Sequence, residues 1–368
     1  MHRQTRAGIL QIMLKKRKKT KPIFIGNVGV GGSHPISVQS MTNVPTDNVE
    51  AVAAQICKFA AAGCEIVRVS VPDKQSAEAL PSILEQSPLP IVADIHFDYR
   101  LALAAIDAGI HGLRINPGNI GSRKRAEAVA KAASQKSVPI RIGVNAGSLE
   151  KDLLQKFGGP TPEAMVESAL GHVRILEDLD FNAIKISLKA SDVISTVEAY
   201  RLMSKKCKYP LHLGITEAGT LFTGTIKSSV GLGILLADGI GDTIRVSLSA
   251  DPVEEVRVGW EILKSLDMRE RGVRVVACPT CARSNFDVSA AATEIERRLG
   301  DLLEPVKVAV MGCVVNGPGE ARQVDVGAAG LKKGKVALYL KGKRVRTINE
   351  DDVVDIVEKE VRTLAGKN

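Results

Sequence analysis

Short runs of β-branched residues recur along the chain, and alanine-rich stretches separate them. Eight of these runs are candidate strands, at residues 36–40, 65–71, 90–96, 112–116, 138–144, 182–188, 210–216 and 243–248. The stretches between them, such as 49–62 and 162–179, carry apolar residues at helical spacing. Repeated strand–helix units of this kind indicate a parallel sheet covered by helices.

The number of units decides between two parallel architectures. Eight strand–helix units within about 245 residues favour a closed barrel. A doubly wound open sheet is the alternative, but no GxGxxG motif follows the first strand. We therefore predict an α/β protein whose residues 22–268 form a (β/α)8 TIM-like barrel that binds the substrate.

The pattern changes after Met268. A charged segment, RERG at 269–272, precedes candidate strands at 273–279, 306–313 and 335–340 and candidate helices at 288–299 and 351–365. This mixture predicts a small α+β domain over residues 269–368.

The charge of the chain is concentrated at its N-terminus. The 368 residues have a net charge of +9, and the first 22 hold eight Lys or Arg residues and no acid, so the rest carries about +1. The KKRKK run at 15–19 is typical of a solvated terminus, and we expect residues 1–21 to form a disordered basic arm. A nucleic-acid patch is the alternative.

Composition argues against two classes of partner. Aromatic residues make up only 3% of the chain, fewer than base-stacking platforms usually need. The basic terminus lacks the apolar core of a signal peptide, and no run of 18 apolar residues occurs. We expect a cytoplasmic protein with neither a nucleic-acid nor a membrane partner.

The ends of the predicted barrel strands are unusually basic and polar. They carry Arg68, Asp94, His96, Arg114, Asn116, Arg141, Asn145, Lys189, His212, Glu217, Arg245 and Ser247. Chemistry in such barrels gathers at the carboxyl ends of the strands, and arginine matches phosphate oxygens bidentately. The set predicts a phosphorylated or diphosphate ligand, with a merely solvated rim as the alternative. Glycine-rich turns at 115–121 and 143–148 add backbone N–H groups suited to phosphate.

Three of the six cysteines, Cys278, Cys281 and Cys313, lie in the last quarter of the chain. No histidine follows His212, which disfavours a Cys3His zinc site there, and a redox CxxC pair would leave Cys313 without a role. An iron–sulfur cluster with three cysteine ligands and a different fourth ligand fits. Zinc and ordinary thiols remain open. Glu320, in MGCVVNGPGE (311–320), is a candidate fourth ligand.

Ten motifs together resemble those of the bacterial 4-hydroxy-3-methylbut-2-enyl diphosphate synthases, over residues from about 22 to 365. They are VQSMTN (38–43), IVRVSVP (66–72), ADIHFDYR (93–100), LRINPGNIG (113–121), IRIGVNAGSLE (140–150), SLKASDV (187–193), LHLGITEAG (211–219), GIGDTIRVSL (239–248), ACPTC (277–281) and GCVVNGPGEA (312–321).

The resemblance implies an iron–sulfur oxidoreductase of the non-mevalonate isoprenoid pathway. Such an enzyme opens the ring of 2-C-methyl-D-erythritol 2,4-cyclodiphosphate by reductive dehydration, giving (E)-4-hydroxy-3-methylbut-2-enyl diphosphate. A [4Fe–4S] cluster is implied, with Cys278, Cys281, Cys313 and an exchangeable Glu320 as ligands. The implied diphosphate contacts are Arg68, Arg114, Arg141, Asn145, Lys189 and Ser247.

The resemblance also implies further roles and partners. Glu217 resembles the catalytic carboxylate, Asn316 a residue of the cluster domain that reaches the substrate, and Asp94, His96 and His212 supporting residues. Flavodoxin or ferredoxin is the implied electron donor. A head-to-tail homodimer is implied, in which the cluster domain of one subunit caps the barrel of the other. The alternative hypothesis is a non-redox barrel transferase acting on a diphosphate substrate, similar to dihydropteroate synthase.

Overall fold

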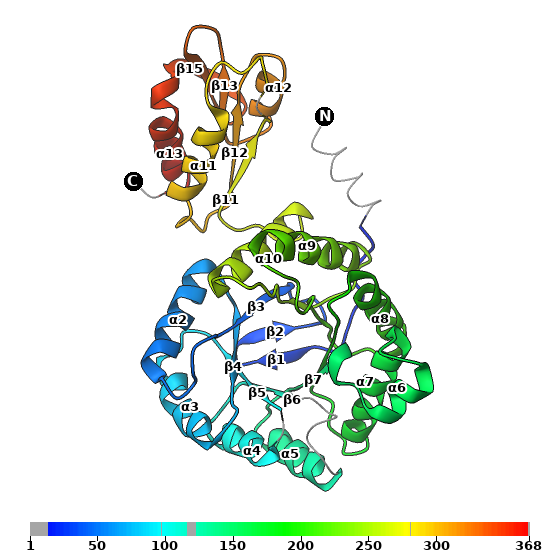
Figure 1. Ribbon diagram of the computed structural model, residues 1–368. Helices are drawn as coiled ribbons and strands as arrows, with labels where there is room; N and C mark the ends of the chain where they lie inside the picture. The colour runs from blue at the N-terminus through cyan, green and yellow to red at the C-terminus, as the bar shows by residue number, and fades with distance from the viewer. Residues whose placement is uncertain (1–13, 97, 116–122, 280, 367–368) are drawn as a thin grey trace. The chain divides into compact units, whose positions relative to one another are not determined.

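The computed structural model describes residues 14–96, 98–115, 123–279 and 281–366. The chain divides into two compact units, one ending at Arg269 and the other beginning at Glu270 (Figure 1). Most of the predicted glycine-rich turn at 115–121, with Asn116, lies outside the described residues, as do residues 1–13 of the expected arm. None of the described helices is both long enough and apolar enough to span a bilayer.

The first unit contains a ring of eight parallel strands (Figure 1). The strands are β3 (Ser37–Met41), β4 (Ile66–Ser70), β5 (Ile91–Ile95), β6 (Gly112–Ile115), β7 (Ile140–Asn145), β8 (Ile184–Lys189), β9 (His212–Leu213) and β10 (Thr243–Ile244). Their order is β8-β7-β6-β5-β4-β3-β10-β9, and a parallel bridge from Ile186 to Leu211 joins the two ends. The predicted (β/α)8 class is confirmed.

Helices surround the ring of strands (Figure 1). They are α2 (Val49–Ala62), α3 (Lys74–Gln86), α4 (Tyr99–Asp107), α5 (Arg123–Gln135), α6 (Lys151–Phe157), α7 (Pro162–Glu177), α8 (Val193–Lys206), α9 (Leu221–Ala237) and α10 (Pro252–Ser265). Several begin at a capping side chain: Asp73, Thr161 and Asp192 each accept a backbone N–H of the first turn. Apolar side chains of these helices and of the strands form one large core.

Two barrel strands are shorter than predicted. The runs 210–216 and 243–248 contribute only two strand residues each. Beyond them the backbones exchange single hydrogen bonds, such as Arg245 N to Leu213 O at 2.9 Å. Gly214 explains part of this difference, because glycine weakens a strand and here leaves room for a side chain. A Cβ at Gly214 would lie 2.6 Å from the Lys189 Nζ.

The amino end of the barrel is covered by an antiparallel hairpin, β1 (Ile23–Ile25) and β2 (Val28–Val30), which the sequence did not reveal. Ile23, Ile25 and Val30 pack against residues at the start of β4 and β5. These short strands are apolar enough to seal the amino end, but they are too brief to give a periodic signal.

Residues 15–21 correct the expectation of a disordered arm. Lys15 N and Lys18 N donate to the carbonyls of Ala237 and Gly239, both at 2.9 Å. The Lys15 ammonium lies 2.7 Å from Asp238. Gly239 adopts φ +73°, and a Cβ there would lie 2.6 Å from Lys16 O. Residues 15–21 are therefore held against the barrel, because their backbone and side-chain N–H groups contact carboxylates and carbonyls there.

The second unit has a five-stranded sheet in the order β11-β12-β13-β14-β15. The strands are β11 (Val273–Ala277), β12 (Val306–Met311), β13 (Val326–Gly330), β14 (Lys335–Leu340) and β15 (Lys343–Asn349). The first three are parallel, and the last two are antiparallel to their neighbours. Helices α11 (Val288–Arg298) and α13 (Val353–Leu364) pack on one face, and the short α12 (Gly317–Ala321) packs against β12 and β13.

Strands β13 and β15 were absent from the sequence prediction. The sequence of β13, VGAAG, has little β-propensity. Its small residues are required by close packing, since a Cβ at Gly327 would lie 2.6 Å from the Ala321 Cβ. Strand β15 is an exposed edge with the charged sequence KRVRTIN, which hides its alternation.

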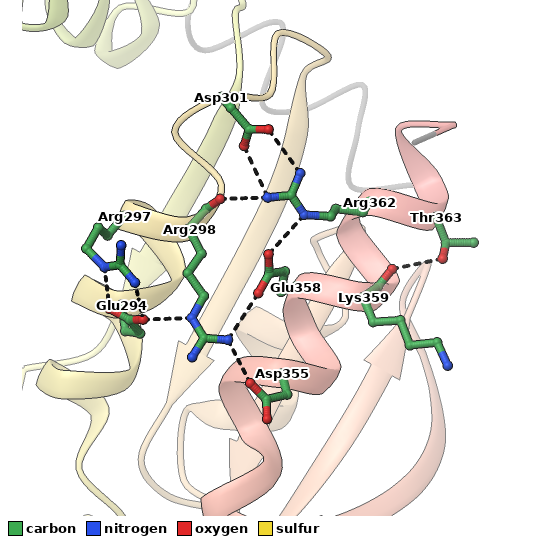
Figure 2. A network of polar contacts seen from close by, with 9 residues as sticks. All are labelled: Glu294, Arg297, Arg298, Asp301, Asp355, Glu358, Lys359, Arg362 and Thr363. Atoms are coloured by element: carbon green, nitrogen blue, oxygen red, sulfur yellow. Dashed lines mark hydrogen bonds and ion pairs between the residues drawn. The ribbon is translucent and has the colours of Figure 1, made fainter. Parts of the chain in front are cut away.

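An ionic network joins α11 to α13 (Figure 2). Arg298 lies 2.7 Å from Glu294, 2.7 Å from Asp355 and 3.1 Å from Glu358. Arg362 lies 2.9 Å from Glu358 and 3.1 Å from Asp301. Both guanidinium groups therefore have carboxylate partners on each helix or on the loop that follows α11.

Candidate active site

Cationic side chains from separate strands gather in the barrel interior. Arg68 lies on β4, Arg114 on β6, Arg141 on β7, and Lys185 and Lys189 on β8. All five are at most 8% exposed. Backbone register places Asp94, Arg114, Arg141 and Lys185 side by side across β5 to β8. The structure thus brings together four of the predicted diphosphate contacts, Arg68, Arg114, Arg141 and Lys189.

Asp94 is the carboxylate at the centre of one half of this group. Arg114 Nη1 donates to Asp94 Oδ1 at 2.9 Å, and Arg68 Nε lies 3.6 Å from Asp94 Oδ2. His96 Nε2 lies 3.3 Å from the same carboxylate. Burial alone would raise the pKa of Asp94, but the charge of Arg68, the His96 contact and the charge of Arg114 hold it well below its usual value.

The other half of the group lacks such compensation. Arg141 Nε and Nη1, Lys185 Nζ and His212 Nε2 are buried without a hydrogen-bond partner among the described residues. Burial, followed by the charges of neighbouring cations, lowers the pKa of Arg141, of Lys185 and of His212 well below the ordinary values. Buried unpaired cations are costly, so this arrangement favours an anionic ligand.

Glycines make room for two of the cations. A Cβ at Gly143 would lie 2.5 Å from Arg114 Nε. At Gly214 a Cβ would lie 2.6 Å from Lys189 Nζ. Because real Cβ contacts are longer, both glycines serve the placement of a charged side chain.

The remaining predicted barrel residues lie at the strand ends. Asn145 closes β7 and is half-buried, and Ser247, after β10, is also half-buried. Glu217 is exposed and adopts φ +52°. A positive φ in a residue other than glycine costs free energy and is concentrated at functional sites. The left-handed backbone at Glu217 is thus a local feature that is consistent with a functional position.

Sequence reasoning missed two charged residues of this interior. Lys185 lies four residues before Lys189 on the same strand, β8. Lys185, Ser187 and Lys189 alternate with apolar residues, and this period of two could have predicted that all three share one face of the strand. Glu255 on α10 accepts hydrogen bonds from Ser40 Oγ and Leu248 N, both at 3.0 Å, and lies 3.4 Å from Arg245. Nothing in the pattern of α10 distinguished Glu255 from a surface acid.

The predicted ligands of the second unit lie near the carboxyl ends of parallel strands. Cys278 directly follows β11, and Cys313 follows the adjacent β12. Gly312 N donates to Cys278 Sγ at 3.1 Å, and Asn285 N, in the loop after Cys281, donates to Gly312 O at 2.9 Å. The two cysteine motifs are thereby held against each other.

Cys313 has the surroundings of a thiolate. The backbone N–H of Val315, and to a lesser extent that of Asn316 and the nearby Arg283 guanidinium, lower its pKa, while desolvation opposes them. Metal-bound cysteine is a thiolate, so this environment suits a ligand. Asn316 and Glu320 are exposed; Asn316 occupies the N-cap position of α12, and Glu320 lies within the helix.

The donor set fits an iron–sulfur cluster by its chemistry, since three thiols lie in adjoining motifs and Cys313 favours the thiolate. Within the described ranges, however, no three His, Cys, Asp or Glu side chains lie close enough together to hold a metal ion. Thr280, inside the CPTC motif, is outside those ranges.

Fold and site define a barrel enzyme that acts on an anionic substrate. The barrel is followed in the chain by a domain that contains the three clustered cysteines. A family model described as the GcpE TIM-barrel domain matches residues 20–260, and one described as the GcpE protein C-terminal domain matches residues 274–363. The chain belongs to the GcpE family.

Named relatives agree with this assignment. A protein of Geobacter sulfurreducens is 61% identical over 95% of this chain and 99% of its own length. One of Acidithiobacillus ferrooxidans is 57% identical over 94% of each chain, and one of Lawsonia intracellularis is 56% identical over 95% of this chain and 98% of its own. Each is named 4-hydroxy-3-methylbut-2-en-1-yl diphosphate synthase (flavodoxin).

Solved structures of other enzymes are similar to part of the chain. Dihydropteroate synthase of Yersinia pestis has a TM-score of 0.49 at 12% identity, covering 67% of this chain and 97% of its own. The 3-dehydroquinate dehydratase of Geobacillus kaustophilus has a TM-score of 0.47 at 15% identity, with the same coverage of both chains.

Proposed function

We propose that this chain reduces and opens 2-C-methyl-D-erythritol 2,4-cyclodiphosphate to give (E)-4-hydroxy-3-methylbut-2-enyl diphosphate. Family membership and the shared name of the relatives support a synthase of this product over a transferase similar to dihydropteroate synthase. The observation that carries the proposal for the barrel is its buried, under-compensated cationic interior, which suits a diphosphate.

The barrel residues would bind and orient the substrate. Among the described residues, Arg141 Nε and Nη1 have no partner, so this guanidinium can donate to phosphate oxygens. Arg68 and Arg114 are oriented by Asp94, so they can contact an anion without rearranging. Lys189, Asn145 and Ser247 add a charge and neutral hydrogen-bonding groups at the strand ends.

Glu217 would serve as the group that holds or moves a proton at its carboxylate. Its exposure leaves the carboxylate accessible to the substrate, and its left-handed backbone marks an unusual local conformation. The charges of the cationic interior would hold the reacting carbons near this carboxylate by anchoring the diphosphate.

In the second unit, Cys278, Cys281, Cys313 and Glu320 would hold a [4Fe–4S] cluster. When bound, such a cluster supplies electrons and a Lewis-acidic iron. Glu320 is exposed on a five-residue helix, which suits a ligand that can leave. Asn316, in the preceding turn, would contact the substrate.

The proposal includes a flavodoxin-type or ferredoxin-type electron donor, because the relatives' name specifies flavodoxin. It also includes a cytoplasmic location, which the six free cysteines support.

A head-to-tail homodimer with a composite active site completes the proposal. Phe222, five residues after Glu217, is 74% exposed, and Val314 and Val315, directly after Cys313, are 54% and 62% exposed. Exposed apolar side chains beside both sets of functional residues are the surfaces that a second copy would cover. Mixing Arg141→Met with Cys313→Ser should restore activity in mixed dimers, and two inactive variants that stay inactive together would argue for independent subunits.

Turnover tests the proposed reaction directly. Anaerobically reconstituted protein with a chemical reductant should convert the cyclodiphosphate, and Cys313→Ser should lose almost all turnover. Cys57→Ser is the matched control, because Cys57 is exposed on α2. A Cys313→Ser variant with full turnover, or a colourless zinc-loaded protein after reconstitution, would overturn the proposal.

Glu320→Gln tests the exchangeable ligand. The cluster should still assemble, with a shorter lifetime measured by the decay of its absorption under air. Normal lifetime together with normal turnover would assign Glu320 no role.

A further inference from the structure

Two basic side chains deep in the barrel are given no part in the proposed reaction. Lys185, the second residue of β8, is 2% exposed, and His212, the first residue of β9, is fully buried. Lys185 Nζ and His212 Nε2 have no hydrogen-bond partner among the described residues. His212 Nδ1 is 2.7 Å from Thr243 Oγ1, so the ring is oriented while its other nitrogen stays unpaired.

Cations outnumber acids around both groups. The charges of Arg141 and Arg68 oppose protonation of Lys185 and of His212, and Lys189 and Lys185 itself also oppose protonation of His212. Asp94 is occupied by Arg68, Arg114 and His96.

Asp242 is the remaining acid that acts on Lys185, and it is also already engaged. It accepts hydrogen bonds from Leu211 N at 2.9 Å and from Thr20 Oγ1 at 3.1 Å. In the ligand-free barrel, burial and the charges of Arg141 and Arg68 lower the pKa of Lys185 and of His212 well below the ordinary values. The lowered pKa favours the neutral form of each side chain.

A bound anion reverses this balance. In a low-dielectric interior, negative charge near Arg141 and Lys189 favours the charged forms of the neighbouring bases. Each phosphate of a cyclic diphosphate carries one strongly acidic oxygen and lacks the second ionisation that a terminal phosphate has near pH 6. Any proton taken up on binding near neutral pH therefore goes to the protein.

We propose that Lys185 and His212 take up protons when the cyclodiphosphate binds, so that the inner end of the site becomes cationic only in the complex. This inference rests on the proposed function for the identity of the anion. Lys185 and His212 would then be positioning residues. Their positive charges would help to hold the diphosphate, and neither side chain is required for electron transfer. In the free protein, neutral Lys185 and His212 would add no further repulsion to that among the buried arginines.

Calorimetry measures the uptake. The cyclodiphosphate is titrated into cluster-loaded protein without reductant, near pH 7, in Tris and in HEPES, which differ in ionisation enthalpy. The binding enthalpy should differ between the buffers in the sense of proton uptake. Lys185→Met should take up about one proton fewer per molecule bound, and His212→Gln should also take up less. Lys205→Met, an exposed lysine on the adjacent α8, is the matched control and should behave as the unaltered chain does.

Equal binding enthalpies in both buffers, or full uptake in both Lys185→Met and His212→Gln, would overturn the inference. The proposed function fails separately, if added reductant gives no turnover of the bound substrate.

A measurement on the ligand-free protein needs no substrate. A folded-state pKa below the unfolded value means that the unfolded chain binds more protons, so Lys185 destabilises the fold at neutral pH and less so as pH rises toward about 10. Lys185→Met should therefore raise Tm at pH 7, by an amount that shrinks with rising pH. A Tm lowered at pH 7 would show that Lys185 is a paired structural cation and would overturn the inference.

Discussion

Arginines of the barrel interior and of the helix pair α11–α13 have opposite surroundings. Arg298 and Arg362 lie near the surface, and carboxylates surround them within 2.7–3.2 Å (Figure 2). Arg141 is 3% exposed, and two of its nitrogens have no partner among the described residues. The arginine guanidinium is thus paired with carboxylates near the surface, where solvent also stabilises its charge. In the barrel interior, where burying a charge is costly, Arg141 lacks such pairs among the described residues.

The difference separates a structural role from a binding role. The pKa of Arg298 is raised by its bonds to Glu294, Asp355 and Glu358, so the network stabilises its charge within the protein alone. The pKa of Arg141 is lowered by burial and by the charges of Arg68 and Arg114, so its charge is stabilised only by something the chain does not supply. We expect substitutions in the two regions to affect different properties.

Arg141→Met should give the largest effect of any single change that leaves the cysteines intact. Loss of the guanidinium removes contacts that strengthen with an anionic ligand, and kcat/KM should fall about a hundredfold to a thousandfold. Stability should be unchanged or higher, because a buried unpaired cation is replaced by an apolar side chain. Steady-state kinetics and thermal unfolding measure the two. Arg257→Met, at an exposed ion pair on α10, is the control; a loss of stability in Arg141→Met without loss of activity would reverse the comparison.

Asp94→Asn should have the largest effect on stability within the barrel. It leaves Arg68 and Arg114 buried without their carboxylate, at a cost of about 3 kcal/mol. Because the pKa of Asp94 is lower in the folded state than in the unfolded one, its contribution is present above about pH 4 and is lost as pH falls further. Unfolding in urea at pH 7 and at pH 3 should show a large difference between the two chains at pH 7 and a smaller one at pH 3.

Glu294→Gln provides the contrast for this pH dependence. The bonds to Arg297 and Arg298 lower the pKa of Glu294 to about 2. The side chain is about one-third exposed, so solvent and salt screen these pairs. Its effect should vanish in 1 M salt, whereas that of Asp94→Asn should persist. Equal salt sensitivity at the two sites would mean that Asp94 is solvated.

Sequence reasoning recovered the barrel because short β-branched strands alternate regularly with amphipathic helices, and this alternation is visible along the chain. It missed the hairpin 23–30 and strand β13 because three-residue strands and a Gly/Ala strand have almost no periodic pattern. It treated residues 1–21 as a disordered arm, since the carbonyls of Ala237 and Gly239, which accept from Lys15 N and Lys18 N, lie more than 200 residues away in sequence.

For the site, residue type predicted Arg68, Arg114, Arg141 and Lys189, because charged side chains at barrel strand ends are conspicuous. The motif resemblance supplied roles for Glu217 and Glu320 that residue type alone did not. What the sequence cannot show is compensation: whether Lys185 has a partner depends on where Asp94 and Asp242 direct their oxygens. That distinction needed three-dimensional contacts.

Gly143→Ala tests geometry while leaving every charge in place. The added Cβ would lie 2.5 Å from Arg114 Nε, so the guanidinium must move by several tenths of an ångström while Asp94 still pairs with it. The backbone at Gly143 has no positive φ, so strain is confined to this contact. We expect about a tenfold loss in kcat/KM from misplacement. Gly171→Ala on α7, where a Cβ meets nothing within 4 Å, is the control, and equal activity of both variants would remove Arg114 from the substrate contacts.

Arg298→Met should give the smallest effect, and it completes the comparison. The side chain is about one-third exposed, and its carboxylate partners can be solvated once it is gone. Tm should fall by less than about 3 °C at low salt and by less still at 1 M salt. Turnover should be unchanged, because α11 keeps its apolar contacts through Ala291, Ala292 and Ile295. If Arg298→Met lost activity at unchanged Tm, the paired arginines would also serve the reaction, through the placement of the cysteine motif that precedes α11. The distinction between paired and unpaired cations would then not separate structure from function in this protein.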